Sequence, residues 1–176
     1  MRRYRIFLIL FALFLLEGTI LQWLIPAAWR SSALVAPHLV LVGVIFTSLF
    51  KNRYQGLAYG LGFGMLQDLI YYGHALGIYS FSMGLVGYLF GSAFRFSTRG
   101  IVISLIAAML GSFLYDSLVF GIYHLFLSIV QTGYQWMFLH GILPSMLFNA
   151  LIALLLYMPM RKWLEDDEAD RESEEK

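Results

Sequence analysis

Residues 56–68 read GLAYGLGFGMLQD, and small residues and one carboxylate recur in this stretch at intervals of four. The recurring residues share one face of a helix, because residues four apart in sequence lie one above the other. Small residues at this spacing let two helix backbones approach closely, which favours helix association in a membrane. The stretch predicts a closely packed membrane helix over residues 55–72. The residues of this glycine face are Gly56, Gly60, Gly64 and Asp68.

The rest of the chain is as apolar as this stretch. Of its 176 residues 60% are hydrophobic and 13% are charged, whereas a soluble domain has about 25% charged residues. About 20 apolar residues span the hydrocarbon layer. Six segments approach that length, so we predict an all-α integral membrane bundle of six transmembrane helices within residues 1–163. The expected spans are residues 6–25, 34–50, 55–72, 78–94, 101–123 and 138–160.

The basic residues predict the orientation of this bundle. Nine Lys and Arg residues fall before the first span, in the second and fourth loops or directly after the sixth span, and one falls in the remaining loops. The positive-inside rule then places both termini in the cytoplasm. The acidic tail, residues 164–176, has no apolar periodicity, so we expect it to be disordered. For residues 125–135 the sequence leaves a tilted, an interfacial and a folded-back course open.

A second set of glycines occurs in the fourth predicted span. Three of them share a face, and the short connection after the third span makes the two spans antiparallel neighbours. We therefore expect the two glycine faces to pack against each other. The residues of the second set are Gly77, Gly84, Gly87 and Gly91.

Only three carboxylates lie in the apolar part of the chain: Glu17, Asp68 and Asp116. Each of the two Asp residues follows L-x and precedes a Gly by five residues, so residues 66–73 and 114–121 resemble each other weakly. A charge at bilayer depth is costly, so such groups face the bundle interior, pair or take up a proton. Since no Lys or Arg lies at comparable depth, we expect Glu17 to be neutral at pH 7.

Three further polar or special positions fall within the predicted spans. Asn149, in the middle of the sixth span, is expected to hydrogen-bond between helices. Pro37 and His38 are expected in the first turn of the second span, where proline is tolerated.

The sequence speaks against most catalytic chemistry. It has no Cys, and its four His residues lack the spacing of a zinc site. Nucleophile-elbow, P-loop and dinucleotide-binding motifs are absent from the sequence. A presenilin-like aspartyl protease needs Gly-x-Gly-Asp, but here Gly62-Phe63-Gly64 precedes Met65. We expect no enzyme activity, no metal, no cofactor and no nucleic-acid partner.

The chain resembles the MreD family of bacterial rod-shape-determining membrane proteins over roughly residues 1–163. The resemblance rests on the six short spans, on Pro37, and on glycine motifs in the third and fourth spans. Many members have an acidic or amide residue where His38 stands. The motifs are Gly60-x3-Gly64-x3-Asp68, Gly77 and Gly87-Tyr88-x2-Gly91.

This resemblance implies a non-catalytic scaffold in the cytoplasmic membrane. Such proteins work with MreC, RodA, a class B penicillin-binding protein and, indirectly, MreB to elongate the peptidoglycan wall. The first glycine face, with Asp68, would then be the central packing and coupling face, either within the bundle or against a partner.

Two other readings stay open. The MreD family also looks distantly like the substrate-binding subunits of energy-coupling-factor vitamin transporters, which implies a small-molecule capture subunit with a polar or aromatic outer cavity. The residues available for such a cavity are Asp68, Asp116, Tyr79, Tyr115 and Trp136. A proton-coupled transporter that uses the three carboxylates is the third reading.

Overall fold

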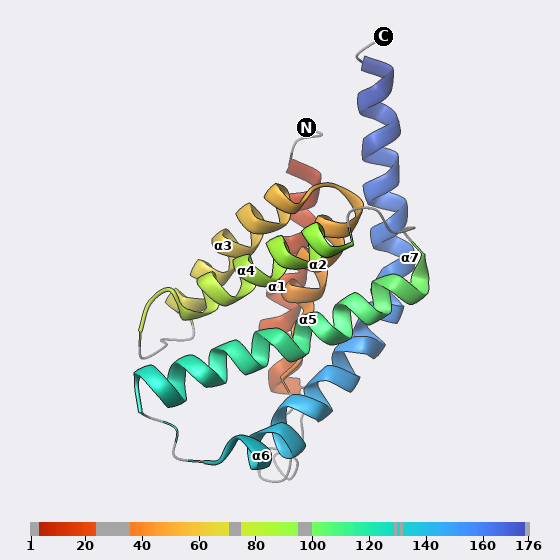
Figure 1. Cartoon of the computed structure of the whole chain (residues 1–176). Coiled ribbons are helices and arrows are strands. Elements are labelled where there is room, and N and C mark those ends of the chain that lie inside the picture. Colours follow the sequence, from red (N-terminus) through yellow and green to blue (C-terminus); the bar gives the residue numbers. More distant parts are fainter. Residues whose placement is uncertain are drawn as a thin grey trace.

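The computed structural model of this protein describes residues 4–23, 36–70, 75–94, 100–128, 130 and 132–174, and the regular structure in these residues is helical throughout. The prediction of an all-α fold is therefore confirmed. Figure 1 shows the helices and their order along the chain. They are α1 (Arg5–Trp23), α2 (Leu39–Phe50), α3 (Arg53–Ile70), α4 (Ile78–Ala93), α5 (Ile101–Gly121), the π-helical turn η2 (Ile122–Phe126), α6 (Tyr134–Met137), the π-helical turn η3 (Phe138–Ile142) and α7 (Leu143–Glu174).

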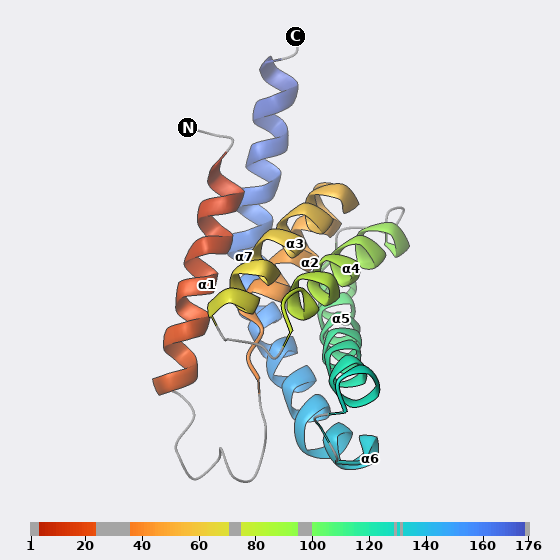
Figure 2. The same ribbon diagram turned by 90° about the vertical axis from the view of Figure 1, so that its left-hand side faces the viewer.

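The short helix α2 forms the centre of the bundle. Its sequence, LVLVGVIFTSLF, is apolar on every side, and a helix of this kind is stable only when it is surrounded. α1, α3, α4, α5 and α7 all pack against it. α3 and α4 form an antiparallel hairpin, α5 crosses obliquely, and α1 and α7 run side by side with both chain ends at the same end of the molecule (Figures 1 and 2).

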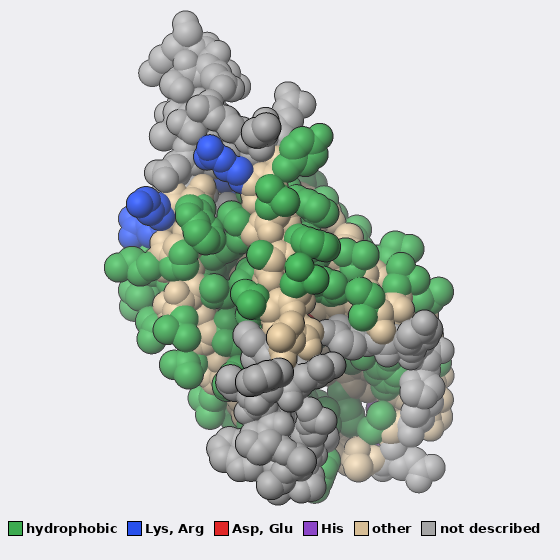
Figure 3. Space-filling model, turned by 180° about the vertical axis from the view of Figure 1, so that it is seen from behind, with side chains coloured by type: hydrophobic (Ala, Val, Ile, Leu, Met, Phe, Trp, Pro, Cys, Tyr) green, Lys and Arg blue, Asp and Glu red, His purple; other side chains and the backbone are tan. Residues whose placement is uncertain are grey.

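Two of the described stretches have the length and composition of a membrane span, Ile101–Phe126 and Tyr134–Trp163. α2 and α4 are apolar but shorter. Large apolar side chains cover much of the described surface in Figure 3, whereas the Lys and Arg side chains gather toward one end. Exposed apolar surface of this extent is typical of contact with lipid or with other proteins.

The structure corrects the expected start of the second helix. α2 begins at Leu39, with His38 as its N-cap residue, so Pro37 and His38 precede the helix instead of lying in its first turn. Proline disfavours helical backbone in the residue before it, which explains why the chain enters α2 only after Pro37.

The C-terminal tail also differs from expectation, because α7 continues as helix to Glu174. The tail is rich in Glu, with Ala and Arg, which are good helix formers. It also extends an existing helix, so no new nucleation is required. From residue 164 on, only the backbone is described.

The chain folds back between α5 and α7. After η2, Ser128 adopts a left-handed backbone with φ 51°, and α6 starts the return. Of the three courses left open for residues 125–135, the described residues therefore take the folded-back one; residues 129 and 131 are not described. Several of the basic residues that predict the orientation fall outside the described residues, namely Arg2, Arg3, Arg30, Arg95 and Arg99.

Candidate functional site

Buried polar side chains from four helices meet around the first turn of α2. A helix start leaves backbone N–H groups without intrahelical acceptors, and inside an apolar bundle these groups need other partners. The side chains that gather there form what we call the α2 polar cluster. Its members are Glu17, His38, Gln67, Tyr115, Asp116, Ser145 and Asn149.

Glu17 of α1 accepts two hydrogen bonds in this cluster. Its Oε2 accepts a hydrogen bond from the backbone N–H of Val40 (2.9 Å), and its Oε1 accepts one from Gln67 Nε2 (2.9 Å). The Tyr115 hydroxyl in turn donates to Gln67 Oε1 (3.4 Å). A carboxylate is favourable at a helix N-terminus because of the helix dipole. The neutral Glu17 expected from the sequence stays a prediction.

His38 joins the cluster through its side chain and its backbone. Its Nε2 lies 2.9 Å from Asp116 Oδ1, and both side chains are 14% exposed. The imidazole and Tyr115 rings also pack edge to face, with centroids 4.9 Å apart. His38 N–H donates to Asn149 Oδ1 (2.8 Å) of α7. Asn149 was expected to hydrogen-bond between helices. In the structure it links α7 to the N-cap residue of α2.

Asp68 caps a different helix, α4. Its two carboxylate oxygens accept the backbone N–H groups of Tyr79 (3.1 Å) and Ser80 (3.0 Å), and its side chain is 1% exposed. The residue that precedes α4 is Gly77, with φ 101°, which has no side chain for capping. Asp68 of the preceding helix therefore takes the role that an N-cap side chain usually has.

The glycines of α3 and α4 lie against each other. A Cβ at Gly60 would be 2.8 Å from the Cα of Gly84, and one at Gly87 would be 2.8 Å from the carbonyl oxygen of Gly56. A Cβ at Gly64 would be 2.5 Å from the Cα of Ser80. The two glycine faces are thus occupied by helices of this chain, and Asp68 ends the same contact.

Two further glycines, Gly84 and Gly91, also lie against α3, whereas Gly77 does not. A Cβ at Gly91 would be 2.8 Å from the Cα of Arg53, and one at Gly84 would be 2.8 Å from the Leu61 side chain. Gly77 has open space around it, and its positive φ is what requires glycine there.

Four of the five residues proposed for a capture cavity lie near one another: Tyr79 donates its N–H to Asp68, and Tyr115 adjoins Asp116 and bonds to Gln67 beside Asp68. Asp68 and Asp116 are used in the contacts above, and Tyr115 is 2% exposed. Trp136 is 47% exposed and stacks on His140, with centroids 4.7 Å apart. Within the part of the chain that the structure describes, no group of three potential metal ligands occurs.

Sequence reasoning named Tyr115 for a capture cavity but missed Gln67 and Ser145. Gln67 had a visible signal, because it is a second polar residue beside Asp68 in an otherwise apolar helix. Ser145, whose Oγ accepts from Ala36 N–H (2.9 Å), had none, because serine is common in membrane helices.

A comparison with known protein families matches residues 1–166 to the family described as rod shape-determining protein MreD. The chain belongs to the MreD family. MreD proteins determine rod shape and belong to the membrane, and theirs is not a known family of enzymes. No curated protein and no solved structure matches the chain. The MreD resemblance is thereby confirmed as a family relationship, whereas the similarity to vitamin-transporter subunits is not shown.

Proposed function

We propose that this MreD family member is a non-catalytic scaffold of the wall-elongation machinery in the bacterial cytoplasmic membrane. It would bind MreC first, and through the resulting complex RodA and a class B penicillin-binding protein, with MreB linked indirectly. All six helical segments would span the membrane, with both chain ends in the cytoplasm.

The use of the buried carboxylates is the observation on which this proposal depends. Glu17 and Asp68 accept backbone N–H groups where α2 and α4 begin, and Asp116 pairs with His38. These groups hold helix ends of the same chain together. Both carboxyl oxygens of Glu17 and of Asp68 accept hydrogen bonds, which supports a rigid bundle and suits a protein that presents its outer surface to partners.

The outer faces of three helices offer apolar surface for partner helices. Packing between membrane helices depends on close van der Waals contact, and large apolar side chains supply it where a partner is complementary. The side chains exposed on these faces include Phe7, Leu8, Phe11, Leu15 and Leu16 on α1, Leu61, Met65 and Leu69 on α3, and Leu147, Leu151, Leu155 and Met158 on α7.

A pull-down from native membranes tests the partner proposal. The tagged chain would carry a photo-crosslinking residue at Leu16, Leu69 or Leu155, one site on each face, and bound proteins would be identified by mass spectrometry. We expect MreC among them, with crosslinks concentrated at one face. Absence of MreC at all three sites, together with normal cell width after depletion of the protein, would refute the scaffold role.

The proposed topology has a direct test, because the chain has no native Cys. Asn52→Cys and Gln135→Cys place single thiols at two exposed positions, one between α2 and α3 and one in α6. A membrane-impermeant maleimide added to intact spheroplasts should label the thiol at position 135 and leave the one at 52 unlabelled. The reverse pattern would invert the topology.

A further inference from the structure

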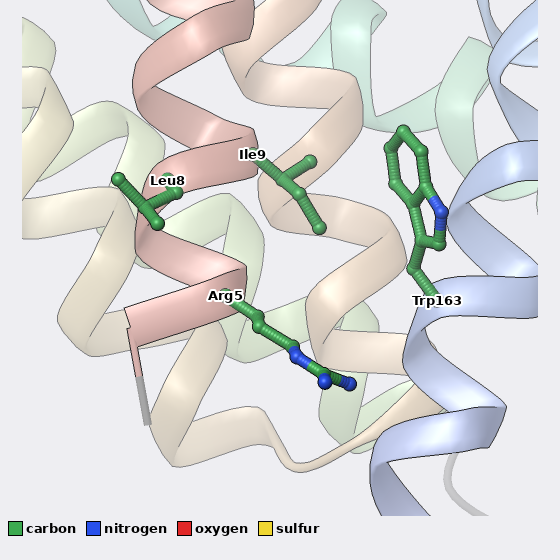
Figure 4. Close-up of a pocket in the computed structure, with 4 residues that line it drawn as sticks. All are labelled: Arg5, Leu8, Ile9 and Trp163. Carbon is green, nitrogen blue, oxygen red and sulfur yellow. The ribbon is translucent and has the colours of Figure 1, made fainter. Parts of the chain in front are cut away.

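A furrow separates α1 and α7 at the end of the bundle where the two chain ends lie. Both helices pack against α2, which lies behind the furrow (Figures 2 and 4). A cavity of about 350 Å³ opens between them. The residues that line it are Arg5, Leu8, Ile9 and Trp163.

The furrow combines a cation, an indole and an aliphatic wall. In Figure 4 the Arg5 side chain extends from α1 toward α7, and the Trp163 ring of α7 lies at the level of Ile9, one turn along α1 from Arg5. Leu8 and Trp163 are 58% and 49% exposed, so the furrow is open to its surroundings. On α1 the aliphatic wall continues two helical turns further, because Leu15 lies seven residues after Leu8 and is also exposed.

In the topology proposed above, on which this inference rests, the furrow lies at the level of the lipid head groups of the cytoplasmic leaflet. Indole rings prefer the head-group level. Arg161 and Lys162 precede Trp163 and add positive charge at the same level. Basic clusters at the cytoplasmic ends of membrane helices attract anionic lipids.

We propose that the furrow between α1 and α7 binds a phospholipid with an anionic head group. The Arg5 guanidinium donates charge-assisted hydrogen bonds to the lipid phosphate, as guanidinium groups do with phosphate oxygens. Trp163 packs at the glycerol level, and one acyl chain lies along Leu8 and Ile9 toward Leu15. A partner helix fits less well, because it would place apolar side chains against the Arg5 cation.

Native mass spectrometry of the full chain, released from nanodiscs of phosphatidylglycerol and phosphatidylethanolamine, tests this proposal. The wild type should retain phosphatidylglycerol preferentially. Arg5→Gln should lower that retention about tenfold, since the charge-assisted contact to phosphate is lost. Lys162→Gln removes the same charge from an exposed position outside the furrow lining. It should lower retention less, by about twofold, because it weakens only the general attraction of the basic cluster for anionic lipid.

A second variant separates loss of binding from loss of folding. Ile9→Trp fills the furrow while Arg5 remains, so it should also abolish preferential retention, with helix content by circular dichroism unchanged. Excess inorganic phosphate should not displace the lipid, because it has no acyl chain to cover Leu8 and Ile9.

Three results would overturn the proposal. They are equal retention of both lipids by the wild type, equal losses in Arg5→Gln and Lys162→Gln, and displacement by phosphate alone. Because the measurement uses the isolated protein, it stands apart from the scaffold role. If Arg5→Gln and Ile9→Trp instead keep the lipid and lose MreC in the pull-down, the furrow is a partner-helix groove and the lipid proposal is wrong.

Discussion

A methyl group added at Gly64 should destabilise the bundle more than a methyl group added to the same helix at a position that does not face α4. The added Cβ would lie 2.5 Å from Ser80 Cα and 2.7 Å from both Ser80 N and Tyr79 O. These are backbone atoms, so no rotamer change relieves the contact and α3 and α4 must separate. The same two residues, Tyr79 and Ser80, donate the hydrogen bonds that Asp68 accepts.

The expected loss has two parts. Overpacking a tight contact costs about 1–3 kcal/mol. Hydrogen bonds inside membrane proteins contribute about 0.6 kcal/mol each, so weakening the two Asp68 bonds adds about 1 kcal/mol. Gly64→Ala should therefore lower the free energy of unfolding by about 2–4 kcal/mol, despite the better helix propensity of alanine.

Reversible unfolding by SDS in mixed micelles, followed by circular dichroism, measures this loss. Gly62→Ala is the matched control, because it lies in the same helix and its Cβ would meet nothing within 4 Å. The control should be as stable as wild type or more stable, by up to about 1 kcal/mol from helix propensity. If Gly64→Ala unfolds no earlier than Gly62→Ala, the close α3–α4 contact is not as described.

Three further predictions concern the carboxylates and use the same unfolding measurement. Glu17→Ala should lower the free energy of unfolding by about 1–3 kcal/mol, because two buried donors lose their acceptor. Glu17→Gln should lower it less, because the amide oxygen still accepts one of the two hydrogen bonds. Equal losses in the two variants would exclude a hydrogen-bonding role for Glu17. Asp68→Asn should keep one of the two α4 bonds and lose about half of what Asp68→Ala loses, and a double-mutant cycle with Gly64→Ala should show a coupling of at least about 0.5 kcal/mol. Asp116→Asn should be tolerated, since its amide oxygen can accept from His38, whereas Asp116→Leu should destabilise; similar stability of the two would mean that the His38 contact is dispensable.

The sequence predicted the helical class, the α3–α4 pairing and the membrane character, because these depend on apolar length and on glycine spacing. Both signals are local, so they are visible without tertiary information. The expected boundaries of α3 and α4 fall within two residues of the observed ones. The predicted start of α2 was wrong by five residues. Apolar composition does not show where side chains, instead of the helix backbone, accept the hydrogen bonds of the backbone N–H groups.

The site could be predicted only in part for the same reason. That Glu17, Asp68 and Asp116 face the interior follows from their cost in lipid. Their partners do not follow, because Val40 lies 23 residues from Glu17, and His38 lies 78 residues from Asp116. Contacts at such separations depend on how the helices cross, which neither composition nor periodicity specifies.

The weak resemblance between residues 66–73 and 114–121 shows how connection length decides the role of a carboxylate. Asp68 is followed by the short connection of residues 71–77, so the next helix starts beside it and its N–H groups are within reach. Asp116 is followed by η2, α6 and η3 before α7 begins, so the next long helix does not start beside it. It pairs instead with His38, the N-cap residue of α2, and Glu17 accepts the backbone N–H of Val40 in the first turn of the same helix. All three carboxylates therefore stabilise helix starts inside the bundle. If the α5–α7 connection were shortened so that α7 began next to Asp116, Asp116 should bond to the start of α7 and release His38.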